Sequence, residues 1–321
     1  MSNKTWSTVI TRMSGSPLFE MARRGKRLPH LLVAVIVLLI ALVVIFASTE
    51  LLVVGLFGGG TEVEQAYYDG AWFLVLPFSL LLVLLWVWVR VYEKRPLSTV
   101  GLPSKGALKR FGVGMLAGFG MIVIVVGIMA TLGLVSVDAE GGRVTGMSAL
   151  GSVALFLFAY MIQSGTEEIL FRGWILQTAT VRHSLVVGLV ANILLFALFH
   201  FPKNPVAGVM LVLFGVFTSL YAIREGSVWG VCGWHAAWNW SQSKLFGLPL
   251  SGHEVPSGTI VNLKTQGAGW LTGGDFGPEG SVIAIVVVLA GCVWLWRGVK
   301  PGYSFAPPVG EQTDNLIMPN E

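Results

Sequence analysis

The sequence predicts an all-α fold, a polytopic transmembrane helical bundle of about eight membrane helices. Of its 321 residues, 54% are hydrophobic and only 12% are charged, and the apolar residues form long blocks. Several blocks reach the roughly 20 residues that a helix needs to cross the hydrocarbon core. Only helices suit these blocks, because an open strand leaves its backbone groups unpaired in lipid and the alternating pattern of a barrel strand is absent.

Eight blocks define the expected helices, in order along the chain. Their approximate bounds are 31–47, 72–89, 111–135, 149–180, 185–200, 206–223, 228–246 and 281–296. No small-residue cleavage site follows the first block at signal-peptide distance, so we expect it to remain as an anchor. The fourth block would make a continuous helix of about 50 Å. We therefore expect it to be tilted, broken near Gly165 or partly outside the lipid.

These blocks divide the chain into five parts. They are a basic N-terminal segment (1–30), three N-terminal membrane helices (31–146), a core of four helices (147–246), a Gly-rich loop (247–280), and a last membrane helix with a polar tail (281–321). The sequence shows no internal repeat and no inverted pair of broken helices. Transporter architecture therefore has little support.

Charged residues alternate between the connections. Basic residues occupy the N-terminal segment, the connection 93–110, the turn at Arg182 and the tail with Arg297 and Lys300. Acidic residues occupy the other loops, at Glu62, Glu64, Asp69, Asp138 and Glu140. The positive-inside rule then predicts cytoplasmic termini, and we expect the plasma (inner) membrane of a prokaryote. Because the basic residues flank membrane helices, they predict the lipid bilayer as a partner and no nucleic acid.

Three polar groups interrupt the apolar helices: Glu167 and Glu168 with Arg172, Phe196 with His200, and His235 with Asn239. A charge near the centre of a spanning helix costs about 2.5 to 3.5 kcal/mol on insertion scales, so these groups need partners or a wet cavity. Their cost points to function.

Spacing predicts which of these side chains share a helix face. Glu168 and Arg172 are four residues apart and can form an ion pair, which has a purely structural interpretation as well. Glu167 is rotated by about 100° and stays free of that partner. His235 and Asn239 are also four apart, and both can serve as hydrogen-bonding links between helices.

Counting residues from the turns predicts that these groups meet. From the turn at 181–184, Glu167 lies about 14 residues along one helix and His200 about 16 along the next, so both reach nearly the same depth. His235 and Asn239 lie about 8 to 12 residues beyond the following turn, toward the same level. A carboxylate, two imidazoles and an amide suit hydrolysis, in which one group takes a proton from water and others hold the oxyanion.

Three sequence strings carry a resemblance to a known family. G-T-E-E-I-L-F-R-G, F-A-L-F-H and H-A-A-W-N resemble the E-E-x-x-x-R, F-x-x-x-H and H-x-x-x-N motifs of the CPBP family, which groups CAAX prenyl proteases with bacterial intramembrane proteases and bacteriocin-immunity proteins. The resemblance spans roughly residues 149–246. It implies an intramembrane protease with Glu167 as the general base and His200 assisting it. Glu168 and Arg172 would brace the site, and His235 with Asn239 would stabilise the oxyanion.

Other interpretations of these residues remain open. Glu167, His200 and His235 could supply three zinc ligands, but no H-E-x-x-H spacing occurs, so we expect no metal or other cofactor. The expected substrate is a hydrophobic or membrane-anchored peptide. The rival function is a non-catalytic membrane scaffold or immunity factor that binds a hydrophobic partner in the same cavity. The Gly-rich loop 247–280 is a candidate cover for the mouth of the site.

Overall fold

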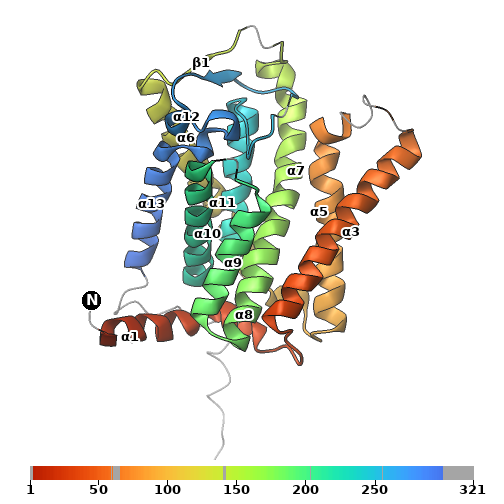
Figure 1. Ribbon diagram of the computed structural model, residues 1–321, viewed down its shortest axis with the longest axis vertical. Helices are drawn as coiled ribbons and strands as arrows, with labels where there is room; N and C mark the ends of the chain where they lie inside the picture. Colours follow the sequence, from red (N-terminus) through yellow and green to blue (C-terminus); the bar gives the residue numbers. More distant parts are fainter. Residues whose placement is uncertain are drawn as a thin grey trace, which may run out of the picture.

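The computed structural model describes residues 3–58, 60, 66–139, 142–202, 204–254 and 256–298. In this part, long helices run roughly along one axis of the molecule, and two short strands in the connections between helices form one small sheet (Figure 1). The predicted class, an all-α polytopic helical bundle, is confirmed. Four charged positions used for the orientation, Glu62, Glu64, Glu140 and Lys300, lie outside the described residues, as does the polar tail beyond them.

Every predicted block is helical in the structure. The helices are α3 (Leu31–Phe57), α5 (Ala71–Val91), α6 (Ala107–Thr131), α7 (Leu150–Glu168) with its continuation, α9 (Leu185–Phe199), α10 (Pro205–Glu225), α11 (Trp229–Trp240) and α13 (Val282–Arg297). Within the described ranges, 5 helices are long and apolar enough to cross a membrane, and α9 and α13 are shorter apolar helices. The chain is therefore an integral, multi-pass membrane protein.

The fourth block forms one helix of 37 residues, Gly146–Arg182, which is about 55 Å at 1.5 Å per residue. It begins as η2 (Gly146–Ala149) and α7, widens into the π-helical segment η3 (Ile169–Ile175), and ends as α8 (Leu176–Arg182). The break considered near Gly165 is wrong, because the helix continues through that residue. The irregularity falls instead directly after Glu168, and π-helical turns of this kind frequently occur at functional sites.

Glycines bring α6 and α11 into backbone contact. A Cβ atom on Gly118 would lie 2.2 Å from the carbonyl oxygen of Trp234, and one on Gly233 would lie 2.1 Å from that of Phe111. Such close approach through small residues is typical of membrane helices. It fixes α11 beside α6, and with it the position of His235, the next residue after Trp234.

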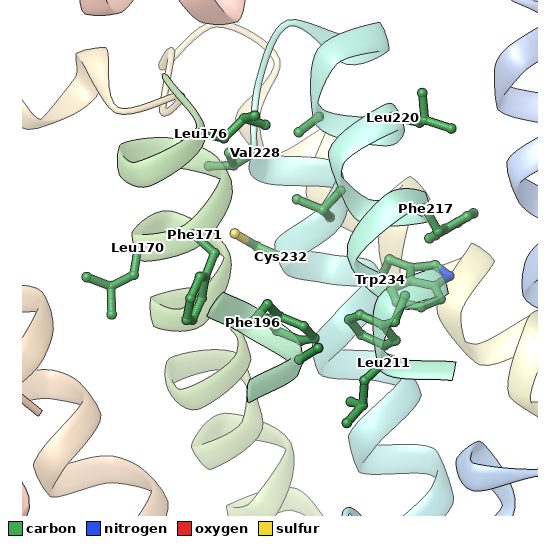
Figure 2. Close-up of a cluster of buried hydrophobic side chains, with 14 of the residues drawn as sticks. Leu170, Phe171, Leu176, Phe196, Leu211, Phe217, Leu220, Val228, Cys232 and Trp234 are labelled. Atoms are coloured by element: carbon green, nitrogen blue, oxygen red, sulfur yellow. The ribbon is translucent and has the colours of Figure 1, made fainter. Parts of the chain in front are cut away.

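Aromatic side chains link η3, α9, α10 and α11 below the polar residues. Phe171 meets Phe196 edge-on at 5.4 Å between ring centroids, and Phe196 stacks on Phe214 at 5.3 Å. Phe214 in turn packs on Trp234 at 4.9 Å. Figure 2 shows Phe171, Phe196 and Trp234 within this buried cluster. Packing thus holds η3, α9 and α11, which carry candidate site residues, together with α10.

One end of the bundle carries the N-terminal segment. It contains two helices, α1 (Asn3–Ser14) and α2 (Pro17–Ala22), and α1 lies across the bundle axis (Figure 1). Here the fully buried Arg95 forms an ion pair with Glu93 at 2.7 Å and donates to Gln177 of α8 at 3.1 Å. These bonds join the connection after α5, which includes η1 (Leu97–Thr99), to α8.

The Gly-rich loop 247–280 lies at the opposite end, after the π-helical segment η4 (Ser241–Leu245) that extends α11. It contains β2 (Leu263–Thr265), α12 (Gly269–Thr272), η5 (Gly274–Phe276) and η6 (Pro278–Gly280). Strand β2 pairs antiparallel with β1 (Val135–Val137), with Val135 opposite Thr265. The loop is therefore tied to the connection after α6.

Candidate active site

The structure brings all seven residues singled out in the sequence to one place in the bundle. Glu167 and Glu168 end α7, and Arg172 follows in η3. Phe196 lies on α9, and His200 caps the end of that helix. His235 and Asn239 lie on α11, one turn apart. The counted depths agree with this arrangement, since Glu167 and His200 face each other across two helices.

Glu167 is surrounded by one amide and two imidazoles. Its Oε1 accepts a hydrogen bond from Nε2 of Gln163 at 2.6 Å. Its Oε2 lies 3.7 Å from Nε2 of His200 and 4.0 Å from Nε2 of His235, and it has no hydrogen-bond partner in the structure. This oxygen is buried, yet both of its nearest ring nitrogens stand slightly beyond hydrogen-bond distance.

The partners of the two histidines define which ring nitrogen carries the proton. Nδ1 of His200 lies 2.8 Å from the backbone oxygen of Phe196, and Nδ1 of His235 lies 2.8 Å from Oε1 of Glu168. Both oxygens only accept, so Nδ1 is the donor in each ring. In the neutral imidazoles, both Nε2 lone pairs therefore face Oε2 of Glu167.

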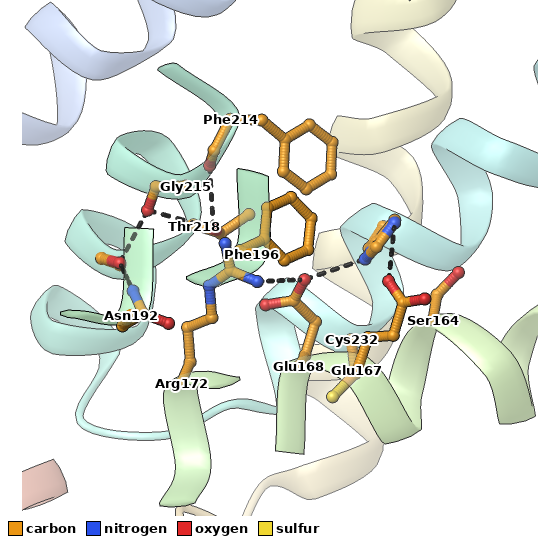
Figure 3. A network of polar contacts seen from close by, with 12 residues as sticks. Ser164, Glu167, Glu168, Arg172, Asn192, Phe196, Phe214, Gly215, Thr218 and Cys232 are labelled. Carbon is orange, nitrogen blue, oxygen red and sulfur yellow. Dashed lines mark hydrogen bonds and ion pairs between the residues drawn. The ribbon is translucent and has the colours of Figure 1, made fainter. Parts of the chain in front are cut away.

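Glu168 and Arg172 form a buried ion pair that also holds His235. Oε1 of Glu168 accepts from Nη1 of Arg172 at 3.1 Å, and neither side chain is exposed (Figure 3). The Arg172 guanidinium also lies over the Phe196 ring, 4.2 Å from its centroid. Glu168 is thus a positioning residue, because it fixes the tautomer and orientation of His235.

Asn239 belongs to a polar cluster that the sequence analysis did not include. Its Nδ2 donates to Oγ of Ser164 at 3.2 Å and to Oε1 of Gln163 at 3.4 Å, while Ser164 Oγ donates to the same Gln163 oxygen at 2.8 Å. Gln163 therefore connects Asn239 to Glu167. A signal was present, since Gln163 is a polar residue four positions before Glu167 on the same face of an apolar helix.

A small pocket next to the histidines has a wall from the Gly-rich loop. The cavity measures about 10 Å³ and is lined by His200, His235 and Asn239 together with Ser251, Phe276 and Glu279 of the loop and four apolar side chains of α9 and α10. The loop residues were not predicted, because no periodicity or motif relates them to the helices. The loop thus forms one wall of the pocket, and its role as a cover for the mouth of the site stays a prediction.

The residues do not form a metal site as they are placed. The donor types suit zinc, but ligand atoms on one tetrahedral zinc lie about 3.2 to 3.5 Å apart, and Glu167 Oε2 is 3.7 and 4.0 Å from the two nitrogens. Among the described residues, no group of three His, Cys, Asp or Glu side chains has the spacing to hold a metal ion. The absence of a cofactor stays a prediction.

Fold and site together define a class: the chain is a multi-pass helical membrane protein with a buried glutamate and histidine cluster between its helices. Residues 149–241 match the family model described as Type II CAAX prenyl endopeptidase Rce1-like. This match confirms the resemblance to the CPBP family.

A curated relative covers a longer stretch of the chain. The uncharacterized protein YyaK of Bacillus subtilis (strain 168) is 31% identical over an alignment of 163 residues, which covers 48% of this chain and 54% of YyaK. The chain thus spans about half the length of that relative. No solved structure matches the chain.

Proposed function

We propose that the protein is an intramembrane endopeptidase that hydrolyses peptide bonds of hydrophobic or membrane-anchored peptides. The observation that carries this proposal is the position of Glu167 Oε2 beside the Nε2 atoms of His200 and His235. Separations of 3.7 and 4.0 Å suit a water molecule held jointly by the carboxylate and an imidazole. The match of residues 149–241 to a protease family supports the same activity.

In this mechanism, Glu167 is the general base. The water gives one proton to Oε2 of Glu167 and keeps its other hydrogen, which is hydrogen-bonded to Nε2 of His200. The water oxygen then attacks the peptide carbonyl carbon. A carbon–oxygen bond forms, and the carbonyl oxygen becomes the oxyanion of a tetrahedral intermediate. Glu167 then passes the proton to the leaving nitrogen as the carbon–nitrogen bond breaks, so no proton is gained or lost.

The oxyanion requires donors, which we assign to His235 and Asn239. His235 donates from Nε2 when it is protonated, and the Glu168 carboxylate at 2.8 Å from Nδ1 stabilises that cation. Asn239 makes only long bonds, 3.2 and 3.4 Å, through Nδ2. One of its two N–H groups can exchange such a bond for the oxyanion.

The test is cleavage of fluorogenic hydrophobic peptides by the purified protein in detergent. We expect Glu167→Ala and Glu167→Gln to lower kcat by at least about 100-fold, and Glu254→Gln, on an exposed glutamate of the loop, to have no effect. Full activity of Glu167→Ala would refute the proposal. Activity that a chelator abolishes would favour the zinc alternative over a metal-independent reaction.

The rival, a non-catalytic scaffold or immunity factor, makes a different prediction. It expects no cleavage by any preparation and an unchanged cellular phenotype of Glu167→Gln, because that substitution preserves the shape of the cavity. The rival would be excluded if the wild-type protein cleaved peptides and the Glu167→Gln variant did not.

The location that we propose is the plasma membrane of a prokaryote, with the α1 end of the bundle cytoplasmic. Arg23, Arg24, Lys26 and Arg182 lie in segments at that end, which the positive-inside rule favours. The pocket and the loop 247–280 would then lie toward the opposite face. Accessibility labelling of a cysteine introduced at Glu254 in intact cells tests this orientation, and labelling from the cytoplasmic side alone would contradict it.

A further inference from the structure

The loop 247–280 contributes an acidic group to the pocket that the proposed reaction does not use. The loop is held against the end of α11: Nε2 of Gln242 donates to the Pro249 oxygen at 2.6 Å, and the Ile260 nitrogen donates to the Lys244 oxygen at 2.9 Å. Glu279 lies further along the loop, in η6, immediately before α13. Its side chain lines the same pocket as His200, His235 and Asn239.

Ser251 engages one oxygen of the Glu279 carboxylate, and the side chain of Trp238 interacts more weakly with the carboxylate. Oε1 accepts two hydrogen bonds from Ser251, one from its backbone nitrogen and one from its hydroxyl, both at 2.7 Å. No hydrogen bond to Oε2 is found within the described residues, although only 6% of Glu279 is exposed. Ser251 therefore fixes the carboxylate and leaves Oε2 available to a ligand.

The pocket contains no lysine or arginine to balance Glu279. When His235 is protonated, its charge is balanced by Glu168 through Nδ1, and Nδ1 of His200 is engaged by the Phe196 oxygen. The nearest arginine of the cluster, Arg172, is engaged by Glu168. Burial accordingly raises the pKa of Glu279 above its ordinary value, and the Ser251 hydrogen bonds, the charge of His200 and the interaction with Trp238 offset this only in part.

Such a pocket discriminates between ligand charges. A carboxylate at the end of a bound peptide would meet Glu279 with no lysine or arginine in the pocket, and burying two like charges is unfavourable. An ammonium or guanidinium group would instead supply the missing counter-charge and donate to Oε2. The two charges would then be buried as a pair.

We propose that Glu279 is a specificity-determining residue that binds a cationic group of the substrate, a lysine or arginine side chain or a free amine close to the cleaved bond. This inference rests on the proposed function of the Glu167 site. The present cavity of about 10 Å³ is about the size of one water molecule, so a side chain enters only when the loop 247–280 moves outward.

The test measures binding in the catalytically silent Glu167→Gln background, so that it does not depend on cleavage. Labelled hydrophobic peptides carry either lysine or the uncharged isostere norleucine at each position in turn, and fluorescence anisotropy in detergent gives Kd. We expect the lysine peptide to bind at least about tenfold more tightly at one position, which is about 1.4 kcal/mol.

Adding Glu279→Gln should reduce this preference to less than about twofold, because glutamine keeps an oxygen that accepts both Ser251 hydrogen bonds but has no charge. Glu279→Asp, which keeps the charge, should retain part of the preference and shows that the loss is not due to misfolding. Glu254→Gln is the matched control on the same loop, and it should leave the preference intact.

Equal binding of the two peptides at every position, binding of neither peptide, or an unchanged preference in the Glu279→Gln variant would each overturn the inference. The inference would also be overturned if the single variant Glu279→Gln, with Glu167 intact, lowered kcat equally for the lysine and norleucine peptides. That result would make Glu279 a proton donor. If the lysine peptide binds more tightly but the wild-type protein cleaves no peptide, only the protease proposal is contradicted. If the wild-type protein cleaves peptides but binds the lysine and norleucine peptides equally, only the role of Glu279 is contradicted.

Discussion

Replacing Arg172 with methionine removes the cation from a pair of side chains that have no solvent exposure. Glu168 would keep one hydrogen bond, from His235 at 2.8 Å, and lose the one from Arg172 at 3.1 Å. Breaking a buried ion pair on one side costs about 3 to 5 kcal/mol, because the remaining charge stays buried. Since His235 still satisfies part of the carboxylate, we expect the lower end, about 3 kcal/mol.

The loss is measured as the free energy of unfolding in mixed detergent and SDS micelles, followed by tryptophan fluorescence. A double-mutant cycle with Glu168→Gln isolates the pair. Arg172→Met leaves the Glu168 carboxylate buried without its cation, and Glu168→Gln removes that charge. The loss of unfolding free energy in the double variant should therefore be smaller than the sum of the two single losses by at least about 1 kcal/mol. Additive losses would refute the coupling.

The exposed pair of Arg23 with Glu20 is the matched control. Its nitrogen–oxygen distance is also 3.1 Å, but the two side chains are 49% and 58% exposed. Surface pairs contribute about 0 to 1 kcal/mol, so Arg23→Met should cost less than about 1 kcal/mol. Equal losses for Arg172→Met and Arg23→Met would show that burial does not determine the energy of the Glu168 pair.

Three further perturbations test the site and its support. Gln163→Leu should lower kcat/KM about 10- to 100-fold in the peptide assay, because Glu167 loses its hydrogen bond of 2.6 Å, and an unchanged rate would exclude Gln163 from the site. Gly118→Ala should reduce the unfolding free energy by more than about 1 kcal/mol, since its Cβ would lie 2.2 Å from a carbonyl oxygen of α11. Gly120→Ala, with no atom within 4 Å, should be neutral or stabilising, and similar losses in both variants would refute the close approach. Because the pKa of Glu279 is raised in the folded state, its stabilising contribution is present below the unfolded pKa, near 4.5, and is lost as pH rises through the raised value. The Tm of the wild-type protein should therefore fall relative to that of Glu279→Gln over this range, and parallel pH profiles would contradict the shift.

The helices and the meeting of Glu167 with His200 were predictable because both depend on local rules. Hydropathy fixes which segments are helical in lipid, and a constant rise per residue fixes the depth of each residue from its turn. The count gave about the same depth for both side chains, and the structure places them 3.7 Å apart.

The contribution of Gln163 and the contact of α6 with α11 were also within reach of the sequence. Gln163 precedes Glu167 by one helical turn, and Gly114 and Gly118 have the spacing of a close-packing motif. Neither pattern contains a charged side chain, so neither carries the insertion cost that marks Glu167 and Arg172 in an apolar helix.

Glu279 and the π-helical segment could not be predicted in the same way. Glu279 reaches the pocket through a loop whose path depends on hydrogen bonds such as that from Gln242 to Pro249, which no periodicity reveals. The widening at Ile169–Ile175 depends on how η3 packs against α9 and on the approach of Gly173 to the Val100 oxygen. Both are properties of the assembled bundle.

The widened turn of η3 also has a consequence for insertions and deletions. A π-helical turn accommodates one residue more than an α-helical turn of the same rise, so it is equivalent to a single-residue insertion in an α-helix. Deleting one residue from Ile169–Ile175 would therefore convert it to an α-helical turn and leave the faces of α7 and α8 nearly in register. Deleting Leu176 from the regular helix α8 would instead rotate α7 by about 100° relative to Gln177. With α8 anchored by Gln177 to Arg95, that rotation would turn Glu167 away from His200. The widened turn can thus lose a residue without moving the site, whereas the regular helix beside it cannot.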